Sequence, residues 1–368
     1  MRSLLITGGA GFIGGNFVHY WTKHYAADRV VVLDALTYAG NLATLGALVD
    51  QRITFVKGDI ADAPIVQQVM DLHSIDTIVH FAAESHVDRS IIDPGAFVRT
   101  NVVGTQILLD AARRAWYADG KWKPSVRFHH VSTDEVYGTL SLTDPPFTEL
   151  TPYSPNSPYA ASKAGSDHLV RAYSHTYGLP VSISNCSNNY GPFQFPEKLI
   201  PLMIVNALHG KMLPIYGDGQ QVRDWLYVED HCVAIDRILQ SDVPGETFNV
   251  GGRAEHVNID IVRTICALID ERFRDSAALA AKFPDCPAAR GAACATLMTH
   301  VTDRPGHDRR YAIDPTRIAT KLLFEPVESL NTGLRRTVDW YLAEHAWWEA
   351  VQDGSYRQWI ERQYEQRG

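Results

Sequence analysis

The chain has 368 residues, 45% of them hydrophobic, and a formal net charge of -8 at pH 7. This length is ample for a buried core and predicts two domains, or one large α/β domain with an appendage. The acidic balance argues against a nucleic-acid-binding protein, which needs a basic face.

Membrane, secretory and metal-binding classes are also disfavoured. No apolar run approaches the length of a membrane span, and the first residues lack the plan of a signal peptide. The five cysteines are scattered and have no CxxC spacing. We therefore expect no disulfide framework, no zinc or other metal site, and a cytoplasmic location.

The first half alternates short apolar runs with helical patterns. The runs lie at 4–6, 30–33, 53–56, 77–81 and 126–128, and the helical patterns lie at 12–24, 62–73 and 94–118. Short β-branched runs of this kind are typical of parallel strands covered on both faces. The order predicts an α/β fold with a Rossmann-type doubly wound parallel sheet, whose ligands bind at the C-terminal ends of the strands.

The texture changes after about residue 190, where prolines become frequent and shorter helices are expected near 258–273 and 329–344. We predict a first domain over 1–190 and a smaller, mixed α/β domain that binds substrate, mainly over 191–368, between which the chain is free to cross. The stretch 276–297 is rich in alanine, and we expect a surface insertion without chemistry.

A glycine motif follows the first predicted strand and opens a helix. Gly8, Gly11 and Gly14 have the GxxGxxG spacing, which allows a tight turn, close approach of a pyrophosphate and close packing of helix on strand. The helix N-terminus, at Phe12 and Ile13, offers amide groups to phosphates. The motif predicts a dinucleotide site.

Other predicted cofactor contacts end the following strands. Asp34 lies 20 residues after Gly14, where a carboxylate can bind a ribose and repel a 2′-phosphate, which favours NAD over NADP. Asp59 and Ile60 follow the third strand; Asp59 reaches the adenine, caps a helix, or does both. Small residues at Ala82 and Ala83 suit close passage of the cofactor, and 84–88 supplies polar groups at the mouth of the site, among which we give His86 no role.

A catalytic set is predicted beyond the fifth strand. Thr133, Asp134 and Glu135 follow that strand, and Tyr159 and Lys163 are spaced to share one face of a helix. A lysine ammonium beside a phenol favours the phenolate, so we expect Tyr159 to act as a base near neutral pH.

Five blocks in order extend this set. They are Thr133–Glu135, Asn185–Pro192, Phe195–Pro201, Arg223–His231 and Asp303–Arg310. With the glycine motif and the Tyr/Lys pair, they resemble the extended short-chain dehydrogenase/reductase superfamily and, within it, the dTDP-glucose 4,6-dehydratase family. The resemblance covers nearly the whole chain.

The resemblance implies a lyase that uses NAD and converts dTDP-glucose to dTDP-4-keto-6-deoxy-glucose and water. Tyr159, Lys163 and Thr133 would serve oxidation at C4, Glu135 would remove the C5 proton, and protonated Asp134 would release the C6 hydroxyl. Two adjacent carboxyl groups can fill both roles if their environments separate their pKa values. Reduction at C6 would regenerate NAD within one cycle, in a route to rhamnose or another deoxysugar of a surface lipopolysaccharide.

The resemblance also implies the remaining contacts. Asn189 would touch the cofactor with Tyr159 and Lys163, and Arg223 would bind the diphosphate. The other expected substrate contacts are Ser85, Thr133, Asn188, Lys198, Leu199, Pro214, Tyr216, Asn258, Arg304, His307 and Tyr356. A homodimer through helices near 94–118 and 158–177 is expected, with no nucleic-acid or membrane partner. Ala35 stands where the family usually has lysine, so NAD is expected to be held less tightly.

Alternative functions keep the fold and change the reaction. A UDP-glucose dehydratase would use the same catalytic groups, whereas a sugar-nucleotide 4-epimerase or UDP-glucuronate decarboxylase would have no need of Asp134 and Glu135. A catalytically silent NAD-sensing protein would have no use for Thr133, Tyr159 and Lys163 together.

Overall fold

The computed structural model describes residues 1–49, 51–274, 276–303 and 306–352. Its largest element is a parallel sheet of seven strands in the order β12-β8-β7-β4-β1-β2-β3. The strands are β1 (Ser3–Thr7), β2 (Arg29–Asp34), β3 (Ile53–Lys57), β4 (Thr77–His80), β7 (Arg127–Thr133), β8 (Val181–Cys186) and β12 (Thr247–Val250). The direction of winding reverses between β1 and β4, which is where doubly wound sheets bind ligands.

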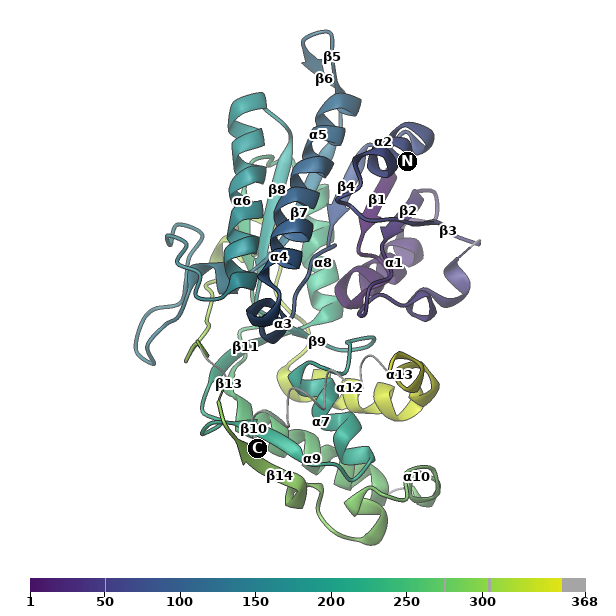
Figure 1. Ribbon diagram of the computed structural model, residues 1–368, viewed down its shortest axis with the longest axis vertical. Coiled ribbons are helices and arrows are strands. Elements are labelled where there is room, and N and C mark those ends of the chain that lie inside the picture. Colours follow the sequence, from purple (N-terminus) through teal and green to yellow (C-terminus); the bar gives the residue numbers. More distant parts are fainter. Residues whose placement is uncertain (50, 275, 304–305, 353–368) are drawn as a thin grey trace.

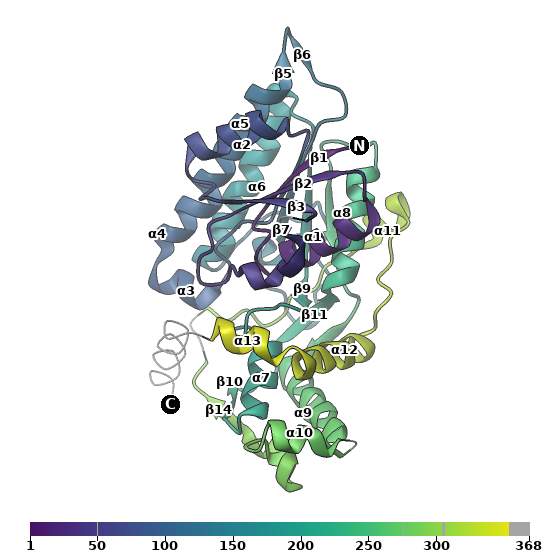
Figure 2. The same ribbon diagram turned by 90° about the vertical axis from the view of Figure 1, so that its right-hand side faces the viewer.

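Helices cover both faces of this sheet (Figures 1 and 2). Along β1, Leu5 faces a core shared with α2 (Ala63–His73), α5 (Thr105–Trp116) and α6 (Pro158–Tyr177). Its neighbours Leu4 and Ile6 face the opposite core, shared with α1 (Phe12–His24) and α8 (Val228–Gln240). The alternation follows from the two-residue period of a strand, and it explains why strands buried on both faces have nearly continuous apolar sequences.

A smaller layer lies beyond the C-terminal edge of the sheet (Figure 1). It contains the three-stranded sheet β13-β11-β9 and the parallel pair β10-β14. Its strands are β9 (Asn188–Tyr190), β10 (Leu213–Tyr216), β11 (Val222–Tyr227), β13 (Glu255–Val257) and β14 (Met298–Val301). Its helices are α7 (Leu199–Leu208), α9 (Asn258–Arg274), α10 (Ala277–Lys282), α12 (Leu330–Ala343) and α13 (His345–Val351), around one apolar core.

The remaining elements connect the layers or extend from them. They are α3 (Val87–Ile92), α4 (Pro94–Phe97), the hairpin of β5 (Tyr117–Ala118) and β6 (Lys121–Trp122), and α11 (Thr316–Leu322). Short turns of 3-10 helix cover Leu42–Thr44, Gly46–Leu48, Asp134–Tyr137, Pro287–Arg290 and Cys294–Leu297. None of the helices in the described ranges is long and apolar enough to cross a membrane.

Most of the predicted elements in the first half are confirmed. The strands and helices begin and end within a few residues of the predicted positions, but the predicted helix at 94–118 is divided into α4, a π-helical stretch at Val98–Gly104, and α5. The fifth predicted run is longer than expected and continues as β7 to Thr133, so the strand itself delivers the first catalytic candidate.

The stretch 276–297 is exposed or half-buried over most of its length, as expected of a surface insertion, but three of its side chains are buried. Phe283, Cys286 and Cys294 are buried in the core of the smaller layer, because the short helices around them turn these three side chains inward against α9. The segment lines neither of the two pockets described below.

Candidate active site

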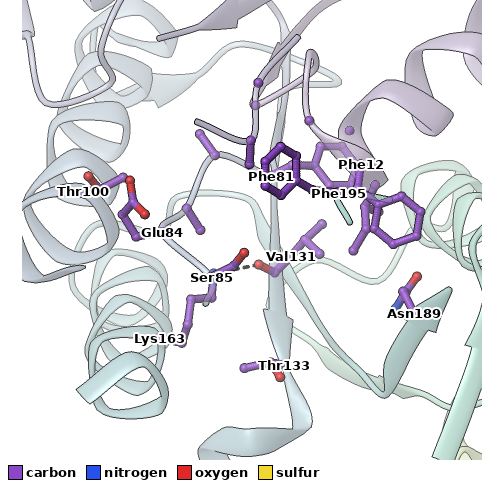
Figure 3. A pocket seen from close by; sticks show the side chains of 18 of the residues that line it. Phe12, Phe81, Glu84, Ser85, Thr100, Val131, Thr133, Lys163, Asn189 and Phe195 are labelled. Atoms are coloured by element: carbon purple, nitrogen blue, oxygen red, sulfur yellow. Dashed lines mark hydrogen bonds between the residues drawn. The ribbon is translucent and has the colours of Figure 1, made fainter. Parts of the chain in front are cut away.

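Two adjoining pockets lie where the large sheet meets the smaller layer, with volumes of about 320 Å³ and about 170 Å³. The larger one follows the C-terminal ends of the strands on either side of the switch between β1 and β4. All thirteen residues that the sequence assigned to the cofactor line it. They are Gly8, Gly11, Phe12, Ile13, Gly14, Asp34, Asp59, Ile60, Ala82, Ala83, Tyr159, Lys163 and Asn189; Phe12, Lys163 and Asn189 are labelled in Figure 3.

The glycine turn leaves no room for side chains at its tight positions. Gly8 has φ +70°, and a Cβ there would lie 2.6 Å from the backbone nitrogen of Ala82. A Cβ on Gly14 would lie 2.3 Å from the carbonyl oxygen of Gly8. The glycines therefore bring the first turn of α1 against β1 and β4, with its amide groups facing the cavity, which is the cradle that a pyrophosphate requires.

Asp34 is fixed before any ligand binds. Its Oδ2 accepts a hydrogen bond from the backbone N–H of Ala10 at 2.9 Å, and its Oδ1 accepts one from Leu36 at 2.8 Å. Burial raises the pKa of the carboxyl, and these two hydrogen bonds oppose the rise. Each carboxylate oxygen keeps a further lone pair, so Asp34 can still accept hydrogen bonds from a ribose.

Asp59 does not cap a helix. Its Oδ1 accepts a hydrogen bond from the N–H of Ala61 at 2.8 Å, and its Oδ2 pairs with Arg99 at 3.1 Å. The N-cap of α2 is Asp62, whose side chain accepts from Ile65. Asp59 therefore closes a turn beside the pocket. The prediction that it caps a helix was wrong, because the N-cap is Asp62, three residues later.

The catalytic candidates converge from two elements. Thr133 ends β7, and its side chain accepts a hydrogen bond from the N–H of Glu135 at 3.3 Å, which starts the short helical turn of Asp134–Tyr137. Tyr159 and Lys163 lie one turn apart on α6, both buried. All five residues line the larger pocket, and Glu135 lines both pockets.

Asp134 has the environment of a proton donor. Its side chain is buried, and its Oδ2 has no hydrogen-bond partner in the part of the chain that the structure describes. Burial, then Glu135 and Asp224, raise the pKa of Asp134 well above its ordinary value. The two adjacent carboxyl groups therefore differ in environment, as the sequence argument required.

The pair of Tyr159 and Lys163 differs from expectation. Burial and the charge of Glu135 raise the pKa of Tyr159 well above 10, while a hydrogen bond with Thr133 lowers it only partly. The Lys163 ammonium donates to the carbonyl oxygen of Val131 at 2.9 Å, the dashed line in Figure 3. Desolvation therefore acts against the lowering of the Tyr159 pKa that we expected from the neighbouring lysine.

The smaller pocket gathers the expected substrate contacts. Asn188, Lys198, Leu199, Pro214, Tyr216, Arg223, Asn258 and His307 line it, whereas Ser85 and Thr133 line the larger pocket, and Asn188 and Lys198 line both. The Oδ1 atoms of Asn188 and Asn258 are buried, with no hydrogen-bond partner among the described residues. Such atoms are costly unless a ligand satisfies them. Arg304 and Tyr356 lie outside the described residues.

Arg223 is held as a buried cation. Its guanidinium stacks over the ring of Tyr311 at 4.2 Å and donates to the carbonyl oxygen of Asp308 at 3.0 Å. Tyr311 was missed by sequence reasoning, because it reaches the pocket only through pairing of its segment with β11, beside the bridge between Val222 and Arg310. No local motif signals such a contact.

A second cluster that sequence reasoning missed lies beside the cofactor pocket. The Arg89 guanidinium stacks over the ring of Tyr38 at 3.7 Å and pairs with Glu197 at 3.1 Å. Glu197 and Phe195 line the pocket, and Phe195 packs edge-on against Tyr38. The cluster joins the loop after β2, α3 and the segment before α7. Phe195 and Glu197 lie in the block Phe195–Pro201 that carried the resemblance, but no sequence signal pointed to Arg89 or Tyr38.

The comparison with known proteins agrees with this geometry. The profile of the family described as GDP-mannose 4,6 dehydratase matches residues 5–337, which is most of the chain. The chain belongs to this family. The resemblance to the dTDP-glucose 4,6-dehydratase family is confirmed by relatives that carry this name.

Individual proteins that are similar to this chain carry a more specific name than the family. A protein of Xanthomonas campestris pv. campestris (strain B100) named dTDP-glucose 4,6-dehydratase is 55% identical over 359 residues, which cover 97% of this chain and 98% of the relative. The crystal structure of the dTDP-glucose 4,6-dehydratase of Bacillus anthracis str. Ames in complex with NAD is 41% identical with a TM-score of 0.81, covering 95% of this chain and 100% of that one. The enzyme of the same name from Streptomyces venezuelae, also with NAD, is 46% identical with the same TM-score and coverage.

Proposed function

We propose that this chain is an NAD-dependent dTDP-glucose 4,6-dehydratase, a hydro-lyase acting on a nucleotide sugar. The observation that carries the proposal is the buried Asp134 carboxyl, whose pKa is raised and whose Oδ2 is unpartnered among the described residues, beside Glu135 in the wall between the two pockets. Elimination of water needs a proton donor for the C6 hydroxyl and a base for the C5 proton, and oxidation at C4, for which Tyr159 is the base, needs neither of these two groups. The names of the relatives support the same reaction.

The residues of the larger pocket fit a dinucleotide. The glycine turn gives a pyrophosphate its amide cradle, and Asp34 supports NAD because its carboxylate would repel a 2′-phosphate. When bound, NAD supplies a positively charged ring that accepts hydride from C4 of the sugar and returns hydride to C6. A positive charge bound in this pocket would lower the pKa of Tyr159, in the sense opposite to the effect of Glu135, and so favour its role as a base.

The protein's own groups then divide the proton transfers. Tyr159, assisted by Thr133 and Lys163, takes the proton of the C4 hydroxyl as C4 is oxidised. The resulting ketone makes the C5 proton acidic, and Glu135 removes it. Asp134 gives its proton to the C6 hydroxyl, so that the C6–O bond breaks and water leaves. Glu135 returns its proton to C5 as C6 is reduced, and Tyr159 and Asp134 regain their starting states by proton exchange.

The smaller pocket would hold the nucleoside diphosphate. Arg223 supplies a buried cation for the diphosphate, and the orphaned amide oxygens of Asn188 and Asn258 require donors from the ligand. Pro214 and Tyr216 would border the nucleobase of the substrate. The other substrate contacts that we propose are Ser85, Thr133, Lys198, Leu199 and His307, all of which line one of the two pockets.

The deciding experiment is incubation of purified protein with dTDP-glucose without added cofactor, followed by mass spectrometry of the nucleotide sugar. We expect loss of one water, since the cofactor is recycled in each turn. Loss of water only after addition of NAD would keep the reaction and indicate weak retention of NAD, to which Ala35 contributes. An unchanged mass with and without NAD would refute the proposal. A parallel incubation with UDP-glucose tests whether the enzyme prefers thymine or uracil as the nucleobase of its substrate.

We also propose a homodimer in the cytoplasm. The stretch expected at the dimer interface exposes Val98 and Val103, and Ile91 and Ile92 are exposed just before it; such apolar side chains support a contact with a second copy. All five cysteines are free, which suits a reducing compartment. Light scattering of the purified protein tests the dimer. The product would enter the synthesis of rhamnose or another deoxysugar.

A further inference from the structure

A buried polar cluster lies beneath the catalytic residues, on the side of α6 that faces β7. Its centre is Asp167, which is inaccessible to solvent and one helical turn beyond Lys163. Asp167 Oδ2 accepts hydrogen bonds from Ser132 at 2.9 Å and from Tyr153 at 2.8 Å, and its Oδ1 lies 3.1 Å from Nε2 of His130. The carboxyl group thus joins β7, α6 and the loop before α6.

One buried lysine, Lys163, lies one helical turn before Asp167 on α6. The contacts with His130 and the charge of Lys163 lower the pKa of Asp167. Besides Ser132 and Tyr153, β7 contributes His130, β8 contributes the Asn185 amide at 3.4 Å, and α6 contributes Lys163. Burial and Lys163 lower the pKa of His130 to about 4, so this imidazole is neutral at pH 7. Arg171, also on α6, donates a hydrogen bond to the hydroxyl of Tyr153 at 2.7 Å.

The converse holds for Lys163. It is buried, and its Nζ donates to a backbone carbonyl, which does not carry a charge. A lysine in such a place tends to lose its proton, because desolvation penalises the ammonium. Desolvation does lower the pKa of Lys163, and the Asp167 carboxylate is the largest influence that raises it.

We propose that Asp167 is a positioning residue of the reaction: its carboxylate is the counter-ion that keeps Lys163 a cation beneath Tyr159, and its hydrogen bonds to Ser132 and Tyr153 fix that charge relative to the end of β7. This inference rests on the proposed function, because the charge on Lys163 matters only if Lys163 assists Tyr159 in that reaction. Asp167 itself touches neither substrate nor cofactor. Asp167 lines neither pocket.

The test is Asp167→Asn, which keeps the shape and removes the charge, with kcat for dTDP-glucose measured from pH 6 to 10. Without the carboxylate, Lys163 loses its proton at lower pH, so the alkaline limb of the profile shifts to lower pH by about one to three units. On that limb each unit lowers kcat about tenfold. The matched control is Tyr153→Phe, which removes a hydrogen bond to the same carboxylate and leaves the charge, so its alkaline limb stays at the wild-type position.

The outcomes separate a charge role from a structural one. Equal alkaline limbs in wild-type and Asp167→Asn protein would overturn the role of Asp167, even if the variant is less stable. An inactive wild-type protein would refute the proposed function instead. In that event, or if Asp167→Asn does not fold, the state of Lys163 is read in the wild-type protein from the ¹³Cε resonance of labelled lysine, assigned by its absence in Lys163→Met. An ammonium at pH 8 is expected, and a neutral amine would overturn the inference.

Discussion

Replacement of Asp134 by Asn separates the two consequences of its buried carboxyl. Asn has nearly the same shape, so the packing around residue 134 is retained. It has no proton to release to the C6 hydroxyl, and loss of a general acid typically lowers kcat by a factor of about 10² to 10⁴. Oxidation at C4 and removal of the C5 proton by Glu135 do not use Asp134, so these steps should continue.

The same substitution should increase stability, and the effect should depend on pH. Because the pKa of Asp134 is raised in the folded protein, the folded state binds more protons than the unfolded state at pH values above the unfolded pKa. Stability therefore falls as pH rises, by about 1.4 kcal/mol per unit, until the folded pKa is reached. The uncharged amide of the variant has no such cost. The melting temperature of the variant should gain on wild type by about 2 °C per pH unit above the unfolded pKa, until the folded pKa is reached.

The assay is carried out in D₂O with dTDP-glucose. Asp134→Asn should release little dehydrated product, while recovered substrate gains one deuterium at C5, because Glu135 still exchanges that proton when the ketone forms. Asp230→Asn is the control: it removes another buried carboxyl with a raised pKa, whose Oδ2 accepts the N–H of Glu328 outside both pockets. A kcat of the Asp134 variant within about threefold of wild type, or recovered substrate without deuterium, would contradict the reasoning.

Four further changes test other parts of the site. Gly14→Ala should abolish dinucleotide binding, because its Cβ would collide with the carbonyl oxygen of Gly8; bound nucleotide released on denaturation measures this, and a full complement of NAD would contradict it. Tyr159→Phe should lower kcat by at least about a hundredfold while NAD content is retained, and retained turnover would exclude Tyr159 as the base. Arg89→Met removes the stacking on Tyr38 and the ion pair with Glu197 beside the cofactor pocket, so exchange of bound NAD for labelled NAD should accelerate. An unchanged exchange rate would show that these two contacts do not retain NAD. Ala35→Lys should slow the same exchange, and faster exchange would show that the alanine does not weaken retention.

Sequence reasoning reached those parts of the site that the chain carries as local motifs. The glycine turn, Asp34 and the small residues Ala82 and Ala83 each follow a strand whose apolar run is visible in the sequence, and parallel strands bring their C-terminal ends to one edge. Tyr159 and Lys163 were placed together by helical spacing. These positions depend on neighbours within a few residues, so a single sequence suffices to predict them.

What was missed depends on pairing between distant segments. Tyr311 reaches Arg223 through a bridge between β11 and a segment about ninety residues later, and Arg89 of α3 meets Tyr38 and Glu197 from two other segments. Spacing on a helix gives the proximity of Tyr159 to Lys163 and says nothing about desolvation or the charge of Glu135, both of which raise the pKa of Tyr159. The burial of Phe283 could not be predicted, because the small residues around it show no apolar pattern in the sequence.

The place of β12 at the edge of the large sheet has a consequence for synthesis of the protein. β12 spans Thr247–Val250 and pairs with β8, while α8, which precedes it, packs on α1 near the start of the chain. The sheet therefore cannot close until roughly two thirds of the polypeptide has left the ribosome, and a nascent chain that stops at residue 190 leaves β8 as a bare edge with apolar side chains uncovered. Such an edge is a template for aggregation, so the ribosome-bound intermediate is the species that chaperones must protect, and translation pauses before residue 250 would lower the yield of folded protein.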